Sequence, residues 1–255
     1  MLIRLIHILF VAHRNGLGKY LMDNNTRIHR IFYLWVFVFL PIKKEMKNTT
    51  FGYKLKVTLE ELGPFYVKLG QILSIRPDIF NEDIISALST LQSDVKQFPW
   101  SEANKIILLA YNKPISELFI EFNETPIAAG SISQVYKARL KKGNHLVALK
   151  VKRPNIEKYI SNDISLLRKL AILLESVSRT AKHYKIKNII SEIEYRINLE
   201  LDFYKEIVNT QELARLHRDN GDRKVIFPKI YSEISNQSIL AMEWIDAIPI
   251  IDENA

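Results

Sequence analysis

The amino-acid sequence predicts an α+β fold, in which a helical N-terminal region precedes a five-stranded antiparallel sheet that packs around a long helix. Three observations lead to this prediction. Residues 126–154 show the alternation of consecutive half-buried strands. Residues 161–175 and 189–216 carry apolar side chains at helical spacing. Two later apolar runs, at 225–231 and 237–244, complete the predicted sheet.

The segment from Pro126 to Pro154 predicts a strand, a turn of small residues, a second strand, a tight connection and a third strand. The apolar residues of the third strand share one face of the sheet, so Ala148 and Lys150 share the other. A kinase-type nucleotide site needs this arrangement, because a small residue fits under a purine ring while a lysine reaches the phosphates. The alternative is an ordinary β-meander with a surface lysine.

The turn before the second strand matches, position by position, the kinase phosphate loop G-x-G-x-x-G-x-V. Gly130 is the middle glycine of that pattern, and Ala128 and Ser133 occupy the positions of the other two. A loop with so few glycines should be stiffer than a kinase loop. The residues predicted to line the phosphates from this loop are Ile127, Ala128, Ala129, Gly130, Ser131, Ile132, Ser133, Gln134 and Val135.

Composition limits the classes of function. A chain of 255 residues with 47% hydrophobic and 25% charged residues can bury a sizeable core in one or two domains. Because the sequence has no cysteine, it excludes disulfide scaffolds, thiolate metal sites and cysteine nucleophiles. The histidines show no metal-ligand spacing, so we predict no metal site built from side chains of this chain.

Residues 1–50 carry most of the formal net charge of +8. Their basic side chains flank a continuous aromatic-rich run, Ile31 to Leu40, which is too short to span a bilayer and lacks the polar spacing of a nucleic-acid surface. We therefore expect an arm that lies on an anionic membrane surface, and no binding to nucleic acid. The alternative is a helix buried against the rest of the protein. The basic residues of this arm are Arg4, Arg14, Lys19, Arg27, Arg30, Lys43, Lys44 and Lys47.

Residues 51–120 predict a helical region. Gly63-Pro64 begins a helix in the expected way, with proline in the first turn. Lys68 and Gln71 lie three residues apart on one face of that helix, and Gly70 would allow another backbone to approach closely. Taken alone, this pattern indicates a solvated lysine.

Several motifs, in this order along the chain, resemble the UbiB-type atypical kinase family, the bacterial members of a group that supports ubiquinone biosynthesis. Lys68 to Gln71 matches the family's K-x-G-Q, and Leu88 to Ser93 is similar to L-x-x-L-Q-D with serine in place of aspartate. Val147 to Pro154 matches V-A-x-K-V-x-R-P. The E-x-D and E-A-x-N motifs correspond to Glu200 to Asp202 and to Glu206 to Asn209. The resemblance covers residues 50–255, and more weakly the arm before them.

The resemblance implies roles for the carboxylates. Glu206 is the expected partner of Lys150, forming the ion pair that orients a kinase lysine toward phosphate. Lys68 is expected to meet the pair Glu200 and Asp202. On an unbroken helix those two carboxylates are turned roughly 200° apart, so Lys68 should contact only one of them directly unless the helix breaks near Leu201.

Met242-Glu243-Trp244-Ile245 resembles a kinase gatekeeper and hinge. By that resemblance, Met242, Glu243 and Ile245 would hold the adenine edge of a nucleotide through the backbone. The alternative is a plain edge strand. In a kinase the catalytic aspartate and the magnesium ligands follow the hinge, so we expect them beyond Ala255 and assign no catalytic residue in this chain.

The resemblance implies that the full-length protein binds ATP with Mg²⁺, acts as an atypical kinase or ATPase and promotes ubiquinone biosynthesis at the cytoplasmic face of the bacterial inner membrane. Expected partners are an anionic membrane surface, ubiquinone-biosynthesis proteins or lipid precursors, and a separate C-terminal half. A non-catalytic, membrane-associated scaffold or truncated pseudokinase is the alternative. The predicted domains are the arm at 1–50, a helical K-x-G-Q extension at 51–120, and a kinase-like N-lobe at 121–255 that ends after the hinge, with the C-lobe absent.

Overall fold

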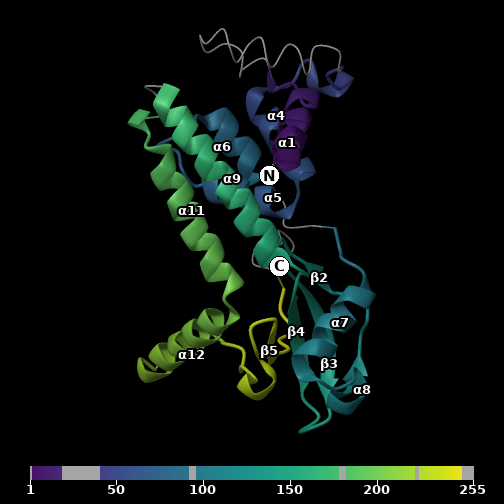
Figure 1. The fold of residues 1–255 in the computed structure, drawn as a ribbon. Coiled ribbons are helices and arrows are strands. Elements are labelled where there is room, and N and C mark those ends of the chain that lie inside the picture. Colours follow the sequence, from purple (N-terminus) through teal and green to yellow (C-terminus); the bar gives the residue numbers. More distant parts are fainter. Residues whose placement is uncertain (1, 19–40, 92–95, 178–181, 222–223, 249–255) are drawn as a thin grey trace. The chain divides into compact units, whose positions relative to one another are not determined.

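The computed structural model describes residues 2–18, 41–91, 96–177, 182–221 and 224–248. These residues form two compact units, which we describe separately (Figure 1). The helical unit comprises Met1–Val95 and Lys158–Glu194, and the sheet unit comprises Lys96–Glu157 and Tyr195–Ala255. The chain crosses between the units before Lys96, within helix α9 (Ile156–Val177) and within helix α11 (Ile186–Leu201).

The helical unit is built from helices whose ends follow local capping rules. Thr50 caps α4 by accepting a hydrogen bond from the Tyr53 amide, and Asn81 caps α6 by accepting one from Ile84. Gly63 adopts a φ of 105°, which favours glycine, and the next residue begins α5 as predicted. Besides most of α9 and the first half of α11, the elements of this unit are α1 (Leu2–Arg14), the 3₁₀ turn η1 (Lys44–Met46), α4 (Phe51–Leu62), α5 (Pro64–Leu73) and α6 (Glu82–Ser89).

Gly70 and Gln71, the last two residues of the K-x-G-Q motif, fix α5 within the helical unit. A Cβ atom on Gly70 would lie 2.3 Å from a methyl carbon of Leu91 and 2.8 Å from one of Leu59. The close approach that Gly70 allows is therefore to leucine side chains rather than to another backbone. The Gln71 side chain donates from Nε2 to the carbonyl oxygen of Leu91 at 3.1 Å.

Two basic residues of the predicted arm bind carboxylates of the helical unit. Arg4 donates to both carboxylate oxygens of Asp163, at 2.9 and 2.7 Å, and to the Leu62 carbonyl at 3.2 Å. Lys43, which we expected to face anionic lipid, forms an ion pair with Glu61. The Ile31 to Leu40 run lies outside the described residues. Among the helices that the structure describes, none has the length and apolar character needed to cross a membrane.

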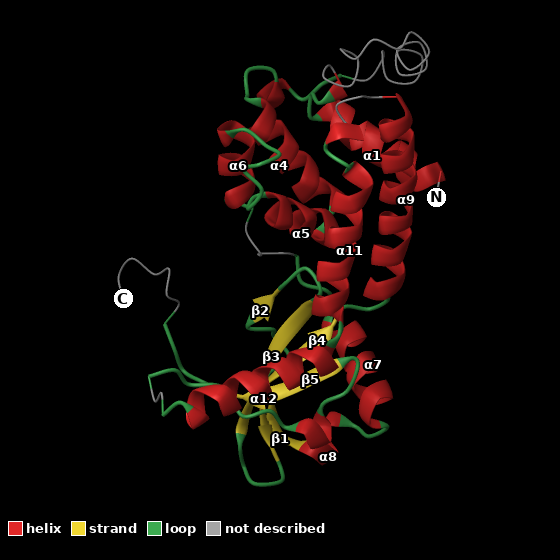
Figure 2. Ribbon diagram, turned by 90° about the vertical axis from the view of Figure 1, so that its left-hand side faces the viewer, coloured by secondary structure: helices red, strands yellow, loops and turns green. Residues whose placement is uncertain are grey.

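The sheet unit contains the predicted five-stranded antiparallel sheet, drawn in yellow in Figure 2. The strands follow the order β1-β3-β4-β5, and β2 pairs with β3. Helices α7 and α8 cover one face of the sheet (Figures 1 and 2). The strands are β1 (Phe119–Phe122), β2 (Ala128–Ala129), β3 (Ser133–Leu140), β4 (Leu146–Lys152) and β5 (Ile239–Glu243). The other elements are α7 (Trp100–Tyr111), α8 (Ile115–Leu118), α12 (Phe203–Asp219) and the 3₁₀ turn η2 (Ser232–Ile234).

The identity of two strands differs from the prediction. Phe119–Phe122 forms β1 directly after the short helix α8, at the end of the region 51–120 that we expected to be helical. The predicted strand at 225–231 is wrong, because the structure shows there only an isolated bridge between Ile230 and Met242. Pro228 lacks the amide donor that a ladder needs, and Ile226 is 75% exposed, so this apolar run is not buried as a strand would be.

The central strands bury one face, as the period-2 alternation predicts. Val147, Leu149 and Val151 of β4 are fully buried, together with Tyr136 of β3. Helix α7 contributes Ala103 and Ile107 to the same core. Each large apolar side chain buried in this way contributes roughly 1.5–3 kcal/mol to stability. Ala148 and Lys150 lie on the opposite face of β4.

The predicted continuous helix at 189–216 is wrong, because the structure has two helices there, α11 and α12 (Figure 1). Asp202 lies between them in an extended conformation, with φ −94° and ψ 91°. Its carboxylate accepts hydrogen bonds from the amides of Tyr204 and Lys205, which makes it the N-cap of α12. Both sides of the break have helical periodicity, so spacing alone does not reveal it.

Candidate nucleotide-binding site

The centre of the candidate site is an ion pair between Lys150 and Glu206. Lys150 Nζ donates to both carboxylate oxygens of Glu206, at 2.8 and 2.7 Å. Lys150 is in β4 and Glu206 is in the first turn of α12, so the contact joins the sheet to the helix. The side chains of Lys150 and Glu206 are 26% and 33% exposed. The pair is therefore accessible to a ligand from solvent. This is the pairing that the family resemblance implies.

Phe203 anchors α12 beneath this ion pair. Its ring is fully buried in a small core with Ile207 and Leu240. Lys150 Nζ lies 5.1 Å from the ring centroid, and Lys152 Nζ lies 5.2 Å from it. Phe203 and Ile207 are four residues apart, so they lie on the same, inner side of the helix. Glu206 follows Phe203 by three residues and is therefore turned toward β4. Sequence reasoning did not select Phe203, although its spacing of three residues from Glu206 indicated that the two share one side of the helix.

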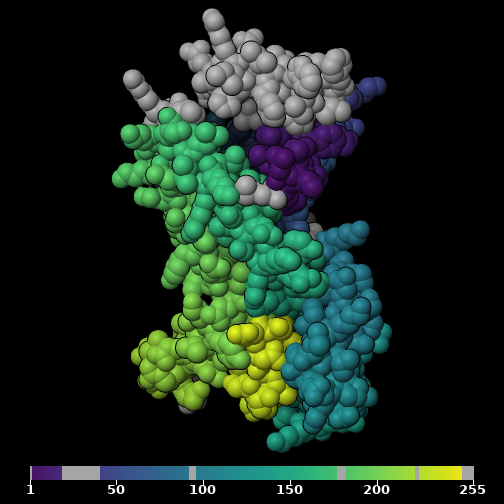
Figure 3. Space-filling model, in the orientation of Figure 1, coloured from purple at the N-terminus to yellow at the C-terminus, as the bar shows by residue number. Residues whose placement is uncertain are grey.

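Outside this inner side, α12 is largely uncovered. Figure 3 shows it in light green at the edge of the sheet unit. Tyr204 and Val208 are 50% and 61% exposed, on the surface away from Phe203. The helix is thus held to the sheet mainly through the residues that surround Glu206.

The neighbours of Ala148 define the rest of this face. In the sheet register, Lys137 of β3 lies opposite Ala148 on one side, and Met242 of β5 lies opposite it on the other. Lys137 Nζ lies 4.3 Å from the ring centroid of Trp244, just after β5. Trp244 Nε1 donates to Asp246 at 2.6 Å. Ala148 therefore has the small size and the position that a purine floor needs, and Lys137 is a basic neighbour that sequence reasoning did not select.

The predicted hinge uses some of its backbone donors inside the protein. The amide of Glu243 donates to the Lys229 carbonyl at 2.8 Å, and the amide of Trp244 donates to the Leu146 carbonyl at 3.1 Å. The Glu243 amide is thus unavailable to an adenine edge in this conformation. The predicted hinge contacts through Met242, through the Glu243 carbonyl and through Ile245 stay predictions.

The predicted phosphate loop is held by its own hydrogen bonds. The amide of Gly130 donates to the Ser133 carbonyl at 2.8 Å, and the amide of Ile127 donates to the Val135 carbonyl at 2.9 Å. Gly130 does not adopt a positive φ, and the nearest atom to a Cβ placed there is 3.6 Å away. The backbone freedom of glycine is therefore not used at this position.

Several predicted loop residues point inward. Ile132, Ser133 and Gln134 are all buried. The Gln134 amide donates to the Phe98 carbonyl at 3.3 Å and to the Tyr136 hydroxyl oxygen at 2.6 Å. These side chains stabilise the loop, so among the predicted loop residues those at 128–131 remain the candidates for contact with a ligand.

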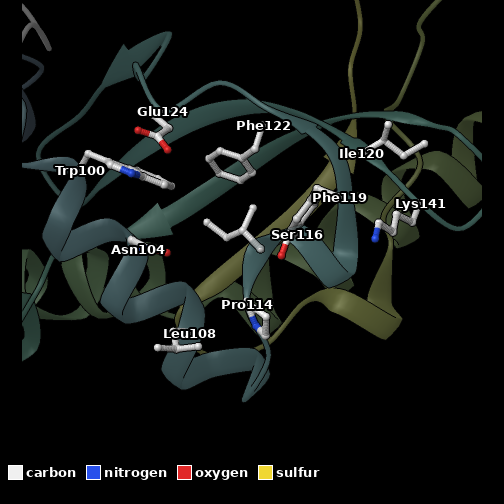
Figure 4. Close-up of a pocket in the computed structure, with 11 residues that line it drawn as sticks. Trp100, Asn104, Leu108, Pro114, Ser116, Phe119, Ile120, Phe122, Glu124 and Lys141 are labelled. Atoms are coloured by element: carbon white, nitrogen blue, oxygen red, sulfur yellow. The ribbon is translucent and has the colours of Figure 1, made fainter.

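A cavity of about 670 Å³ lies on the opposite face of the sheet, between α7, α8 and β1. Figure 4 shows the rings of Trp100 and Phe122 at its wall, with Asn104 and Ser116 among its polar residues. None of the predicted nucleotide-binding residues lines it. The case for a nucleotide site therefore rests on the arrangement around Lys150 and not on this cavity.

The remaining motif residues are divided between the units. Lys68 belongs to the helical unit, whereas Glu200 and Asp202 belong to the sheet unit. The predicted contact between Lys68 and that carboxylate pair therefore stays a prediction. In the described part of the chain, histidine, aspartate and glutamate side chains form no group of three or more that could hold a metal ion.

Comparison with known proteins gives consistent matches. Residues 90–255 match the family model described as the ABC1 atypical kinase-like domain. The chain is 39% identical over 196 residues to the uncharacterized protein slr0889 of Synechocystis sp., covering 76% of this chain and 48% of that protein. It is 34% identical over 252 residues to the probable protein kinase UbiB of Histophilus somni, covering 98% of this chain and 46% of that protein.

A solved structure shows the same fold. The complex of Rv3197 with erythromycin from Mycobacterium tuberculosis is similar with a TM-score of 0.52 and 27% sequence identity, over 75% of this chain and 47% of that one. The chain spans about half the length of the curated relatives that it matches.

Proposed function

The chain belongs to the ABC1 atypical kinase-like family, of UbiB type, and from this premise we propose that its sheet unit binds ATP as the N-terminal part of an atypical kinase or ATPase. The observation that carries the proposal is the contact of Lys150 Nζ with both carboxylate oxygens of Glu206. A lysine held in this way has its charge fixed at one place on the sheet face. Kinases use such a pair to orient the lysine toward the α- and β-phosphates of ATP.

The surrounding residues fit a nucleotide. Ala148 lies two residues before Lys150 on the same face of β4, so a purine ring stacked on Ala148 would place its phosphates toward Lys150. Met242 lies beside Ala148 and would border the base. Residues 128–131 would cover the phosphates. Mg²⁺ bound with the nucleotide would neutralise phosphate charge, and we propose that its protein ligands follow the hinge in the second half of the protein.

Thermal unfolding with and without Mg-ATP tests this proposal. A ligand present at a hundred times its Kd adds roughly 2.7 kcal/mol to the free energy of unfolding. We expect a rise in Tm with Mg-ATP for the wild-type chain and for Lys141→Met, which removes an exposed lysine after β3. Lys150→Met and Glu206→Gln should abolish that rise. If the wild-type chain shows no shift, ATP binding is refuted and the non-catalytic scaffold is favoured.

We propose that the whole protein transfers or hydrolyses the terminal phosphate of ATP in support of ubiquinone biosynthesis, through ubiquinone-biosynthesis proteins or lipid precursors. The names of the UbiB relatives support this assignment. A separately expressed C-terminal half of a relative, added to this chain with Mg-ATP, should release phosphate, and the same mixture with Lys150→Met should not. Absence of release from a mixture that forms a stable complex would contradict the proposal.

Lys68 is proposed to limit which acceptors reach the phosphates, as the family resemblance implies. In that arrangement the K-x-G-Q helix covers the place where a peptide substrate would enter, which favours ATP hydrolysis or a small acceptor. A double-mutant cycle of Lys68→Met and Glu200→Gln tests the proposed contact, because residues in contact couple by about 0.5–3 kcal/mol. No coupling would exclude a direct contact between Lys68 and Glu200.

We further propose peripheral attachment to the cytoplasmic face of the bacterial inner membrane through the basic arm. The arm's charge supports this, although Arg4 and Lys43 are paired within the protein and should contribute little. The chain should sediment with vesicles containing anionic lipid at low salt, less so at high salt, and not with neutral vesicles. Binding to duplex DNA but not to anionic vesicles would refute this attachment.

A further inference from the structure

Arg153 follows β4 directly and binds the predicted phosphate loop at two points. Its side-chain Nε donates to the carbonyl of Gly130 at 2.9 Å. Its backbone amide donates to the carbonyl of Ile132 at 2.7 Å. Arg153 therefore holds two carbonyl groups near the tip of the loop, those of Gly130 and Ile132. The side chain of Ile132 is itself buried.

The same guanidinium reaches the segment where the sheet unit begins. Arg153 Nη2 donates to the carbonyl of Lys96 at 2.9 Å, and its Cζ lies 5.4 Å from the ring centroid of Phe98. Gln134 holds Phe98 through its backbone, accepting from the amide and donating to the carbonyl. Residues 96–98 are therefore joined to the loop at two points, at Lys96 through Arg153 and at Phe98 through Gln134.

The acceptors of Arg153 are backbone carbonyls. Among the described residues, Arg153 forms no salt bridge with a carboxylate. Burial lowers the pKa of Arg153, but a guanidinium stays protonated at any physiological pH. A cation whose partners among the described residues are neutral leaves positive potential behind Gly130, on the loop that would cover the phosphates.

We propose that Arg153 is a positioning residue for this loop, which it holds in advance in the conformation that receives a polyphosphate. This inference rests on the proposed function. A glycine-rich kinase loop is mobile and must be ordered when the nucleotide binds, which costs conformational entropy. A loop that is already attached to Arg153 avoids most of that cost, so the contact should favour ligands with phosphates over those without.

The test compares three variants of the 255-residue chain. Arg153→Met keeps the aliphatic length and removes the donors. Arg153→Lys keeps the positive charge but replaces the two separate nitrogens that bind Gly130 and Lys96 with a single ammonium group. Arg139→Met is the matched control, because Arg139 binds Glu121 and the Asn144 carbonyl near the other end of β3. For each, hydrogen exchange of residues 127–135 is measured without nucleotide, and Kd is measured for Mg-ATP and for adenosine.

For Arg153→Met we expect exchange of residues 127–135 to be about tenfold faster, and the Kd for Mg-ATP to rise about tenfold while that for adenosine changes less than about twofold. Arg153→Lys should be intermediate and Arg139→Met unchanged. Unchanged exchange in both Arg153 variants would overturn the positioning role, as would equal losses of ATP and adenosine. If the wild-type chain binds neither ligand, the proposed function fails, and the exchange rates alone then decide whether Arg153 holds the loop. Arg153→Lys supplies the result if Arg153→Met does not fold.

Discussion

Asp202 caps the helix that carries Glu206. Its Oδ1 accepts the amides of Tyr204 and Lys205 at 3.1 and 3.3 Å, and its carbonyl accepts the Glu206 amide at 3.2 Å. These bonds fix the residue at which α12 begins. Because the position of Glu206 on the helix surface depends on that start, the cap helps to direct Glu206 toward Lys150.

This relationship predicts a stability effect at Asp202. Asp202→Ala should lower the free energy of unfolding by about 1 kcal/mol, because the first amides of α12 lose their acceptor. Asp202→Asn should cost much less, since asparagine caps nearly as well. Asp219→Ala, at the other end of α12, is the control and should be neutral within about 0.5 kcal/mol. Urea denaturation measures all three. Equal losses for Asp202→Ala and Asp202→Asn would show that the negative charge, and not the cap, is what matters.

A matched pair of glycines predicts opposite effects of the same substitution. Gly70→Ala should destabilise the chain by about 1–3 kcal/mol, because its methyl group would collide with Leu91 and Leu59. Gly130→Ala should be neutral or stabilise by about 0.4–1 kcal/mol, since the site has room and its φ is not positive. Midpoints of urea unfolding decide this. A stable Gly70→Ala variant would mean that α5 can move away from those leucines at little cost.

The contact between Arg4 and Asp163 predicts that the first helix stabilises the helical unit. Asp163 is 5% exposed, so Arg4→Met leaves a buried carboxylate without its partner. Because the Arg4 side chain is itself 36% exposed, we expect a loss on the order of 1–3 kcal/mol. Adding Asp163→Leu to Arg4→Met should recover part of it. Lys56→Met, which removes a surface pair at 3.9 Å, should change stability by less than about 0.5 kcal/mol. A similar loss of stability in Lys56→Met would contradict the prediction that the Arg4 contact matters more than a surface ion pair.

The lowered pKa of Glu61 predicts that the stability of the folded chain depends on pH. Burial would raise its pKa, but hydrogen bonds from Lys43 and Asn15 outweigh this and lower the pKa below its ordinary value of 4.5. A carboxyl with a lowered pKa in the folded state stabilises the protein above its unfolded-state pKa, and this contribution is lost as pH falls through the folded-state value. Glu61→Gln should therefore lower Tm at pH 7, and the difference from wild type should shrink below pH 4.5. Glu60→Gln is the control. A difference that is constant from pH 7 to pH 3 would contradict the prediction.

Local patterns in the sequence determined the central part of the fold. The strands predicted from the alternation in β3 and β4, and the helix predicted from the spacing in α9, are confirmed. These patterns could be read from the sequence because each depends only on neighbours along the chain. The same alternation placed Ala148 and Lys150 on one face. The resemblance of Glu206 to Asn209 to the family's E-A-x-N motif implied that Glu206 is the partner of Lys150, and the structure shows this contact.

The tertiary structure decided what depends on distant partners. The run at 225–231 has the composition of a strand but is not paired as one, because pairing depends on the strand beside it. The break at Asp202 is hidden from periodicity, since both flanking segments are helical. The attachment of the loop to Arg153 joins residues 96, 130 and 153, whose side chains and carbonyls meet only after the sheet forms. Hydrophobic periodicity depends on residues that are close in the sequence. Contacts between residues that are distant in the sequence form only when separate surfaces pack together.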